Sequence, residues 1–534
     1  MYQQGFWSDK TTLDFFDQAV KEAPDRIAIV DSNVETRSST RLSYQEFSDK
    51  VDNIALGMIN LGINKHDVVS FQLPNWWQFA ATHIACLKIG AISNPLMPIF
   101  RERELTFMLG FVESKLLIIP KQFRGHDHVA MLDAIRPELP ALENIIVIGG
   151  EDPISFEKVM LEHNLHNTLD KESLFQHRKF SADEVCQIIY TSGTTGMPKG
   201  VMHTSNTLLS SAHSFLKNLE LDQKDIFFMG SPLAHQTGFL YGLLAPIVLQ
   251  TTVVLLDVWS AKAAWPIINK EKVNFTMAST PFLADLVASP LAQKCNSSNF
   301  KIFVCGGAPV PRALVKSAQS QLQLNVATVW GMSEHGAVTS THLDDVEDKI
   351  FNTDGEALPG MEVRIVDNNH QPSAAGEKGE LQARGAFTFV GYLKKPEAYT
   401  VDPEGWFDTG DLAEMDDDGY IRITGRSKDI IIRGGENIPV VEIENLLYKH
   451  DAIQDVAVVA MPDERLGELG CCFITLNPGF ELSFTEMLEY LSENKMTKNY
   501  WPERLEVLAE MPRTPSGKIQ KFHLRDSAQT LTRA

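Results

Sequence analysis

The sequence predicts an α/β protein with a large N-terminal domain and a small α+β C-terminal domain. Patterns typical of helices and strands alternate through roughly the first 400 residues. From about Gly355 the pattern changes to short strands separated by Gly and Asp turns. With 534 residues, the chain is also too long for one hydrophobic core. We place the domain boundary at Gly425–Arg426, which predicts domains of residues 1–425 and 426–534.

The first clear helix shows how the elements of the large domain are read. Ser43 and Glu46 form a capping box, apolar residues follow at helical spacing as far as Leu61, and Gly62 ends the helix. Helical patterns then separate short apolar strands, which we place at residues 68–71, 116–119, 145–148, 185–189, 253–256 and 301–304. This alternation favours parallel sheets covered by helices on both faces. Ligands of such sheets bind beyond the carboxyl ends of the strands.

The later part of the chain predicts two other structures. Short strands at residues 363–366 and 379–381, followed by the Asp-Gly turn at 416–419, indicate an antiparallel, β-barrel-like region that completes the large domain. After Gly425, a helix at Val441–Tyr448 and a strand at Val456–Ala460 indicate the small α+β domain.

Composition and charge exclude several classes of function. Apolar residues make up 44% of the chain and charged residues 22%, a balance typical of globular proteins and not of disorder. The net charge of −21 argues against a nucleic-acid partner, and it requires local cations wherever an anion binds. None of the six cysteines forms a C-x-x-C pair. The adjacent Cys471 and Cys472 are expected to be buried thiols of a reducing, cytoplasmic compartment.

Neither a targeting signal nor a membrane segment is expected. The N-terminal residues lack the charged and apolar regions of a signal peptide, and the C-terminal residues carry no peroxisomal or lipidation signal. The stretch Gly238–Leu256 is apolar, but Pro246 and the polar residues 250–252 divide it into a buried helix and a strand.

The most informative stretch is Tyr190–Gly200, which follows the apolar strand candidate at 185–189. It contains three glycines, four Ser or Thr hydroxyls and Lys199. Glycines let backbone N–H groups turn toward an anion, while the hydroxyls and the lysine add donors and a positive charge. Such runs are often flexible surface turns, but the fixed lysine after Pro198 favours a triphosphate site. Because Gly200 follows Lys199, where a Walker A loop has Ser or Thr, a metal ligand must come from elsewhere.

This loop resembles the signature loop of the acyl-adenylate-forming superfamily, which includes acyl-CoA synthetases, peptide-synthetase adenylation domains and firefly luciferase. Further motifs of the superfamily follow in order, so that the resemblance spans roughly residues 40 to 521. They are Ser231–Gly238, Cys305–Pro311, Val329–Glu334, Trp406–Asp411, Gly425–Glu436 and Pro512–Lys521. The chain is therefore identified as a member of this superfamily.

The resemblance implies a nucleotide site assembled from several of these motifs. The residues expected to bind the nucleotide are Thr191, Ser192, Gly193, Thr194, Thr195, Gly196, Lys199, Gly307, Ala308, Pro309, Trp330, Gly331, Met332, Ser333, Asp411, Arg426 and Lys518. Trp330 replaces the usual Tyr and Ser333 the usual Thr, and both keep the required chemistry, an aromatic face and a hydroxyl. Asp411 is expected to bind the ribose, with Asp408 structural, and Glu334 to ligate Mg²⁺.

The implied reaction has two steps. A carboxylate attacks the α-phosphate of ATP to give acyl-AMP and pyrophosphate, and a thiol, expected to be CoA, then takes the acyl group. Thr191, Lys199, Glu334 and Lys518 are the expected catalytic residues. His235, Gly306 and Met332 are expected near the acid, and Gly434 and Gly435 along the pantetheine arm. Lys428 is the expected hinge about which a mobile C-terminal domain turns. ATP, Mg²⁺ and CoA are therefore the expected cofactors and co-substrates.

The acid and the acceptor are less sharply defined by the sequence. The sequence as a whole most resembles bacterial short- or medium-chain and alicyclic acyl-CoA ligases, such as cyclohexanecarboxylate-CoA ligase. An acyl-AMP ligase that loads a separate carrier protein is the main alternative; a fused carrier is not expected, because sixteen residues follow Lys518. A noncatalytic nucleotide-binding protein is disfavoured by the intact set Lys199, Glu334, Asp411, Arg426 and Lys518, and nothing specific favours a luciferase-like oxygenase. We expect a monomer or a homodimer.

Overall fold

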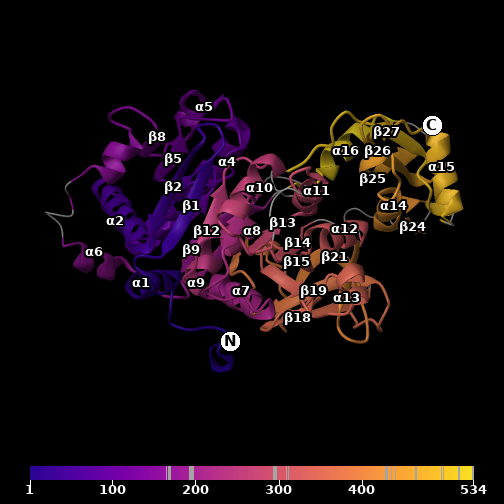
Figure 1. The fold of residues 1–534 in the computed structure, drawn as a ribbon, viewed down its shortest axis with the longest axis horizontal. Helices are drawn as coiled ribbons and strands as arrows, with labels where there is room; N and C mark the ends of the chain where they lie inside the picture. The colour runs from indigo at the N-terminus through magenta and orange to yellow at the C-terminus, as the bar shows by residue number, and fades with distance from the viewer. Residues whose placement is uncertain are drawn as a thin grey trace.

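A computed structural model gives the fold of the chain (Figure 1). It describes residues 1–163, 165, 170–191, 198–292, 298–307, 310, 312–367, 369–426, 431–433, 436–438, 440–463, 466–494, 496, 498–514 and 517–531. Within these ranges the fold is mixed α/β with parallel sheets and a separate C-terminal domain, which confirms the predicted fold class.

One sheet of the large domain has seven strands in the order β20-β10-β9-β4-β3-β5-β8. Its central strands run parallel, whereas β10 runs antiparallel to both β9 and β20. The strands are β3 (Val68–Phe71), β4 (Ile92–Pro95), β5 (Leu116–Pro120), β8 (Asn144–Ile148), β9 (Val185–Thr191), β10 (Lys199–Thr204) and β20 (Gly391–Tyr392). The helices in this part of the chain are α2 (Tyr44–Asn60), α3 (Trp77–Ile89), α4 (Glu102–Val112), α5 (His128–Ile135) and α6 (Lys171–Arg178).

The second sheet has nine strands in the order β17-β16-β15-β14-β13-β11-β12-β1-β2. They are β1 (Ile27–Asn33), β2 (Ser38–Ser43), β11 (Phe227–Met229), β12 (Val253–Leu256), β13 (Phe275–Ala278), β14 (Ile302–Gly306), β15 (Asn325–Met332), β16 (Gly336–Ser340) and β17 (Glu356–Ala357). The accompanying helices are α1 (Thr12–Glu22), α7 (Ser205–Asn218), α8 (Gln236–Phe239), the π-helix η5 (Leu240–Leu244), α9 (Ala245–Leu249), α10 (Ala261–Lys270), α11 (Thr280–Ala288), α12 (Arg312–Leu322) and α13 (Glu347–Asn352).

The structure contains the predicted capping box, helix end and apolar segment at the predicted positions. Ser43 Oγ accepts a hydrogen bond from the Glu46 backbone N–H, and the Glu46 carboxylate accepts one from the Ser43 N–H, at the start of α2. Gly62, with φ +85°, follows the end of this helix. The apolar stretch Gly238–Leu256 forms short buried helical segments followed by β12, as predicted. Among the residues that the structure describes, no helix is long and apolar enough to cross a membrane.

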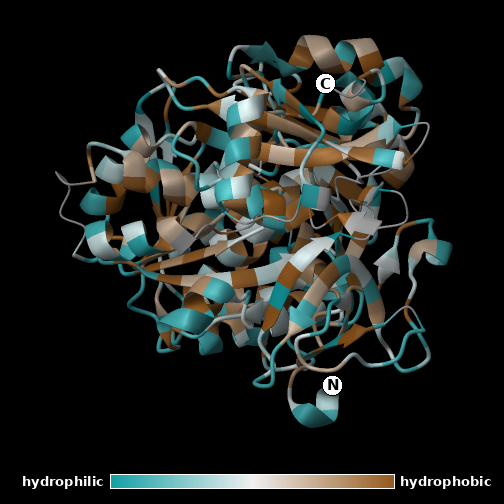
Figure 2. Ribbon diagram, turned by 90° about the vertical axis from the view of Figure 1, so that its right-hand side faces the viewer, coloured by the Kyte–Doolittle hydropathy of each residue, from teal (hydrophilic) through white to brown (hydrophobic). Residues whose placement is uncertain are grey.

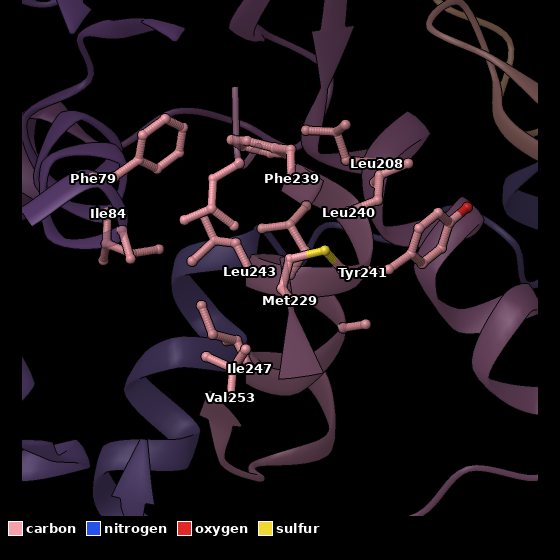
Figure 3. Close-up of a cluster of buried hydrophobic side chains, with 14 of the residues drawn as sticks. Phe79, Ile84, Leu208, Met229, Phe239, Leu240, Tyr241, Leu243, Ile247 and Val253 are labelled. Atoms are coloured by element: carbon pink, nitrogen blue, oxygen red, sulfur yellow. The ribbon is translucent and has the colours of Figure 1, made fainter. Parts of the chain in front are cut away.

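Part of the main core of the large domain lies between α3 and the segments α8 and η5 (Figure 3). Phe79 of α3 and Phe239 of α8 are both fully buried, as are Leu240 and Leu244 of η5. Nearly every side chain of α3 is buried, so this helix is apolar around its circumference and lies inside the domain. Hydrophobic residues concentrate on the inner strands, while the outer helices and loops are more hydrophilic (Figure 2).

A four-stranded antiparallel sheet completes the large domain in the order β18-β19-β21-β22. Its strands are β18 (Met361–Val366), β19 (Gly379–Gly385), β21 (Phe407–Met415) and β22 (Ile421–Arg426). This confirms the change of structure predicted beyond Gly355. The register of β21 and β22 pairs Asp411 with Arg426, two residues predicted to bind the nucleotide.

The C-terminal domain is built on its own five-stranded sheet and has its own hydrophobic core. It comprises β23 (Ile431–Arg433), β24 (Glu436–Ile438), α14 (Val440–Leu447), β25 (Ile453–Asp463), β26 (Gly467–Leu476), α15 (Phe484–Glu493), β27 (Arg504–Val507) and α16 (Lys521–Ala528). The boundary predicted at Gly425–Arg426 falls at the end of β22 and stays a prediction. In Figure 1 this domain lies beside the α11 and α12 end of the large domain.

The remaining short elements are η1 (Tyr2–Gln4), β6 (Gln122–Phe123), β7 (His126–Asp127), η2 (Arg136–Glu138), η3 (Glu157–Leu161), η6 (Pro396–Ala398) and η8 (Lys498–Tyr500).

Candidate active site

The C-terminal domain contributes Lys518 to the large domain through a short turn. Thr514 and Lys518 are joined by a hydrogen bond from the Thr514 N–H to the Lys518 carbonyl, 2.7 Å long. Gly517, at φ +85°, brings this turn so close to the large domain that an added Cβ would lie 2.9 Å from Ser279 Oγ. At the end of β14, a Cβ added to Gly307 would lie 3.2 Å from Lys518 Cε and 3.8 Å from its Nζ. The lysine therefore reaches the carboxyl ends of the parallel strands, where ligands of such sheets bind.

The electrostatic surroundings of Lys518 link it to the other predicted charged residues. Burial, followed by the positive charge of Arg426, lowers the pKa of the Lys518 ammonium to about 8. The carboxylates of Asp411 and Glu334 act in the opposite direction. Residues from three separate motifs thus act on the same ammonium group, which places them around one site.

His235 lies close enough to Lys518 for the charge of the ammonium to change the pKa of the imidazole. It precedes α8 and caps the helix, since its Nδ1 accepts a hydrogen bond from the Thr237 N–H at 3.3 Å. Burial, followed by the positive charge of the Lys518 ammonium, lowers the pKa of His235 to about 3. The imidazole is therefore neutral at physiological pH.

Asp411 is held on both carboxylate oxygens. The indole Nε1–H of Trp330 donates to Asp411 Oδ2 at 2.9 Å, and Arg426 Nε donates to Oδ1 at 2.7 Å. The Asp411 residue is only 3% exposed. A carboxylate can accept about four hydrogen bonds, so these two leave acceptor capacity for ribose hydroxyls. The neighbouring Asp408 is exposed and accepts the Gly410 N–H at 2.9 Å, which makes it part of the turn.

Glu334 and Lys199 are both in contact with Tyr392 of β20. The Tyr392 hydroxyl donates to Glu334 Oε1 at 2.6 Å, and Lys199 Nζ lies 4.4 Å from the centre of the Tyr392 ring. Burial raises the pKa of Glu334, while the Tyr392 hydrogen bond and the charges of Lys199 and Arg426 oppose this shift. Sequence reasoning did not find Tyr392, because a Gly-Tyr pair in a short strand carries no signal of its own.

Thr191 and Lys199 are register partners at the paired ends of β9 and β10. The strand that was predicted to precede the loop is therefore present as β9, and the next strand of the chain, β10, pairs with it in the antiparallel direction. Six loop residues between them lie outside the described part of the chain, including the predicted Ser192, Gly193, Thr194, Thr195 and Gly196. Ala308, Pro309, the hinge residue Lys428, Gly434 and Gly435 also lie outside it.

Two predicted glycines, Gly306 near the acid and Gly331 near the nucleotide, lie where neighbouring strands approach closely. A Cβ on Gly306 would lie 2.5 Å from Val329 Cγ2, and one on Gly331 would lie 2.2 Å from the Gly336 carbonyl oxygen. Packing alone therefore requires glycine at both positions. Ser333 and Met332 follow on the same segment and are half-buried. The Ser333 carbonyl accepts a hydrogen bond from His203 Nε2 at 2.8 Å.

The residues present fit one Mg²⁺ ion shared with a nucleotide. No group of three His, Cys, Asp or Glu side chains that could hold a metal ion occurs among the described residues. Mg²⁺ commonly takes one or two carboxylates together with substrate phosphates and waters, so a cluster is not required. Glu334 can supply such a carboxylate: it is buried, hydrogen-bonded and close enough to Lys199 to be affected by its charge.

A cavity of about 500 Å³ lies elsewhere, between the four-stranded sheet and the C-terminal domain. Lys378 and Arg422 line it from the large domain, and Glu442 and Lys449 from the other side. None of the described site residues lines this cavity, and we assign it no part in the chemistry.

Comparison with known proteins identifies the family. The model of the AMP-binding enzyme family matches residues 16–393, and that of the AMP-binding enzyme C-terminal domain matches residues 442–518. The chain is 37% identical to a medium-chain fatty-acid–CoA ligase of Escherichia coli (strain K12), over 98% of this chain and 91% of that protein. It is 32% identical to a 2,3-dihydroxybenzoate-AMP ligase of Bacillus subtilis (strain 168), over 98% and 95%.

Solved structures show the same fold. The anthranilate CoA ligase AuaEII in complex with anthranoyl-AMP superimposes with a TM-score of 0.88 at 23% identity, over 98% of this chain and 99% of that one. The chain thus belongs to the family of AMP-binding enzymes, the adenylate-forming superfamily that its motifs resemble. Within that family it is an AMP-forming acid–thiol ligase that uses ATP and Mg²⁺, and its relatives include proteins named as medium-chain CoA ligases.

Proposed function

We propose that the enzyme activates a short- or medium-chain fatty acid, or an alicyclic acid such as cyclohexanecarboxylate, as acyl-AMP and then transfers the acyl group to CoA. The observation that carries the first step is the position of Lys518, which the C-terminal domain brings against Gly307. There its ammonium is within the influence of Asp411, Glu334 and Arg426. A cation at this point suits the moment when a carboxylate meets the α-phosphate.

In the first step the described residues mainly bind and orient. Asp411, oriented by Trp330 and Arg426, accepts hydrogen bonds from the ribose hydroxyls. The Lys199 ammonium binds the β- and γ-phosphates, which leave as pyrophosphate. Lys518 holds the carboxylate of the acid against the α-phosphorus and offsets the negative charge of the transition state. The acid oxygen forms a bond to the α-phosphorus while the bond to pyrophosphate breaks. Mg²⁺, held through Glu334, neutralises charge on the phosphates when it is bound.

In the second step the C-terminal domain turns away from this arrangement about Lys428. Lys518 leaves the site, and Gly434 and Gly435 form part of the wall along which the pantetheine arm of CoA enters. The thiol attacks the acyl carbonyl carbon, AMP leaves, and a thioester forms. Lys428, Gly434 and Gly435 lie outside the described part of the chain, so the support for this step is the sequence resemblance.

The identity of the acid is supported by the relatives and by charge. The E. coli relative acts on medium-chain fatty acids, by its name, and shares 37% of residues over almost the whole chain. His235, beside Lys518, is neutral, which suits an uncharged acyl group next to the carboxylate. An apolar pocket discriminates by only about 1–3 kcal/mol per methylene, so activity on several acids of similar size is expected.

Loading of a separate carrier protein is the second candidate. It is favoured by the 32% identity with a protein named as an AMP ligase. The two candidates share the first step and differ only in the thiol that receives the acyl group.

A panel of acids tests both candidates. The purified enzyme is given ATP, Mg²⁺ and hexanoate, octanoate, palmitate, cyclohexanecarboxylate, benzoate or 2,3-dihydroxybenzoate, and pyrophosphate and AMP are measured with and without CoA. We expect acid-dependent pyrophosphate release, and sustained AMP release only when CoA is present. AMP release that does not increase when CoA is added, together with accumulation of acyl-AMP, would favour carrier loading. A preference for the aromatic acids would contradict the proposed acid class.

A cytoplasmic location and a monomeric or dimeric state remain part of this proposal. The location is supported by Cys86, Cys186, Cys305, Cys471 and Cys472, which are buried free thiols.

A further inference from the structure

We propose that Tyr392 is a positioning residue that sets both the Mg²⁺ ligand and the phosphate-binding lysine before the nucleotide arrives. This proposal rests on the proposed function, because it concerns the same ATP site. Tyr392 belongs to no motif discussed above, and it lies on a two-residue strand far in sequence from both of its partners.

The first contact joins the hydroxyl of Tyr392 to Glu334. The distance of 2.6 Å is that of a strong hydrogen bond to a carboxylate. Glu334 is 6% exposed, so this bond stabilises a charge that burial would otherwise disfavour. Hydrogen bonds to a ligating carboxylate fix its orientation, and their loss typically costs about 10- to 100-fold in metal affinity.

The second contact joins the ring face of Tyr392 to Lys199. The ammonium nitrogen lies 4.4 Å from the ring centre, which is within the range of a cation–π interaction. A flexible lysine side chain has many rotamers, and the ring restricts Lys199 to those that keep its charge near Glu334. One side chain therefore acts on the cation and on the carboxylate through different groups.

The backbone explains why Tyr392 can serve both partners. β20 pairs with β10 in the register Tyr392–Val201, and the Leu393 N–H donates to the Gly200 carbonyl at 2.8 Å. Tyr392 is thus attached to the strand that begins at Lys199. On the other side, the Phe389 N–H donates to the Glu334 carbonyl at 2.9 Å. The segment around Phe389 and Tyr392 joins the backbones that carry Lys199 and Glu334.

Two substitutions separate the two contacts. Tyr392→Phe removes the hydroxyl and keeps the ring, whereas Tyr392→Leu removes both. Tyr399→Phe is the matched control, because the Tyr399 hydroxyl donates to the Phe389 carbonyl at 3.1 Å and its ring packs in the same aromatic cluster. Thermal unfolding of each variant checks that it is folded.

The experiment measures binding and needs no turnover. Affinity for α,β-methylene ATP is measured by calorimetry with Mg²⁺ and again in EDTA, and the ratio gives the gain due to the metal. For Tyr392→Phe we expect this gain to fall about 10-fold or more, with unchanged affinity in EDTA. For Tyr392→Leu the affinity in EDTA should also fall, by about two- to fivefold, and Tyr399→Phe should resemble the wild type.

Several results would overturn the inference. An unchanged metal-dependent gain in Tyr392→Phe would show that the hydroxyl does not position Glu334. An equal loss in Tyr399→Phe would show a general effect of the aromatic cluster. A wild-type enzyme that binds the analogue without any metal-dependent gain would instead contradict the proposed ATP site itself.

Discussion

Trp330 and Asp411 are joined by a hydrogen bond of 2.9 Å from the indole N–H to a carboxylate oxygen, across 81 positions of the sequence. Tryptophan, in place of the usual tyrosine, thus connects the adenine side of the predicted nucleotide site to its ribose side. The sequence indicated that Trp330 would keep an aromatic face, but it did not show that the ring nitrogen has a partner.

Trp330→Phe keeps an aromatic face and removes this hydrogen bond. A hydrogen bond to a charged group contributes about 1.5–3 kcal/mol, so we expect the KM for ATP to rise about 10-fold or more, with kcat much less affected. Initial rates at varied ATP concentrations measure the effect. Trp406→Phe is the control, because Trp406 contacts Arg364 and Arg384 in the four-stranded sheet. An unchanged KM in Trp330→Phe would show that Asp411 does not depend on Trp330.

The contrast between what the sequence predicted and what it missed has a physical reason. Parallel sheets, the β region and the charged residues follow from local patterns, since apolar periodicity and turn residues act over a few positions. Tyr392 acts only because β20 pairs with β10 and lies against the segment of Glu334. Likewise, the bond between Trp330 and Asp411 depends on how two different sheets pack. Such long-range pairing leaves no mark in a single sequence.

Lys518→Ala should separate the two steps of the reaction. Without the Lys518 ammonium, less positive charge offsets the negative charge that develops as the acid attacks, so acyl-AMP formation should fall by about 100-fold or more. Thioester formation from supplied acyl-AMP and CoA should be largely retained, because Lys518 is proposed to leave the site for that step. Acid-dependent exchange of pyrophosphate into ATP and release of AMP from acyl-AMP measure the two steps. Lys498→Ala, at an exposed lysine of the same domain, serves as the control, and an equal loss of both steps would contradict the proposed role.

Buried histidines should make the fold sensitive to mild acid. Burial lowers the pKa of His203 to about 4, and its two ring nitrogens contact the Ser333 carbonyl and the Thr207 hydroxyl. As the pH falls below 6.5, His203 becomes protonated in the unfolded chain, whereas in the folded chain it stays neutral until about pH 4. Stability is therefore lost as the pH falls through this window, by about 2 kcal/mol per such histidine between pH 6.5 and pH 5. Urea unfolding at pH 7 and pH 5 should show the loss, and His203→Gln should reduce it. An undiminished slope in that variant would exclude His203 as a source.

The lowered pKa of Lys518 predicts how the first step depends on pH. Because its pKa is about 8 in the free enzyme, the ammonium is present below this pH and is lost above it. The value of kcat/KM for ATP in pyrophosphate exchange reports groups of the free enzyme, so it should decline on the alkaline side of about pH 8. In Lys518→Arg the guanidinium stays charged up to about pH 12, and the alkaline decline should disappear even if the maximal rate is lower. A decline at the same pH in Lys518→Arg would assign the titration to another group. A wild-type profile that stays flat to about pH 10 would contradict the buried position of the lysine in the free enzyme, since an exposed lysine titrates near its ordinary pKa.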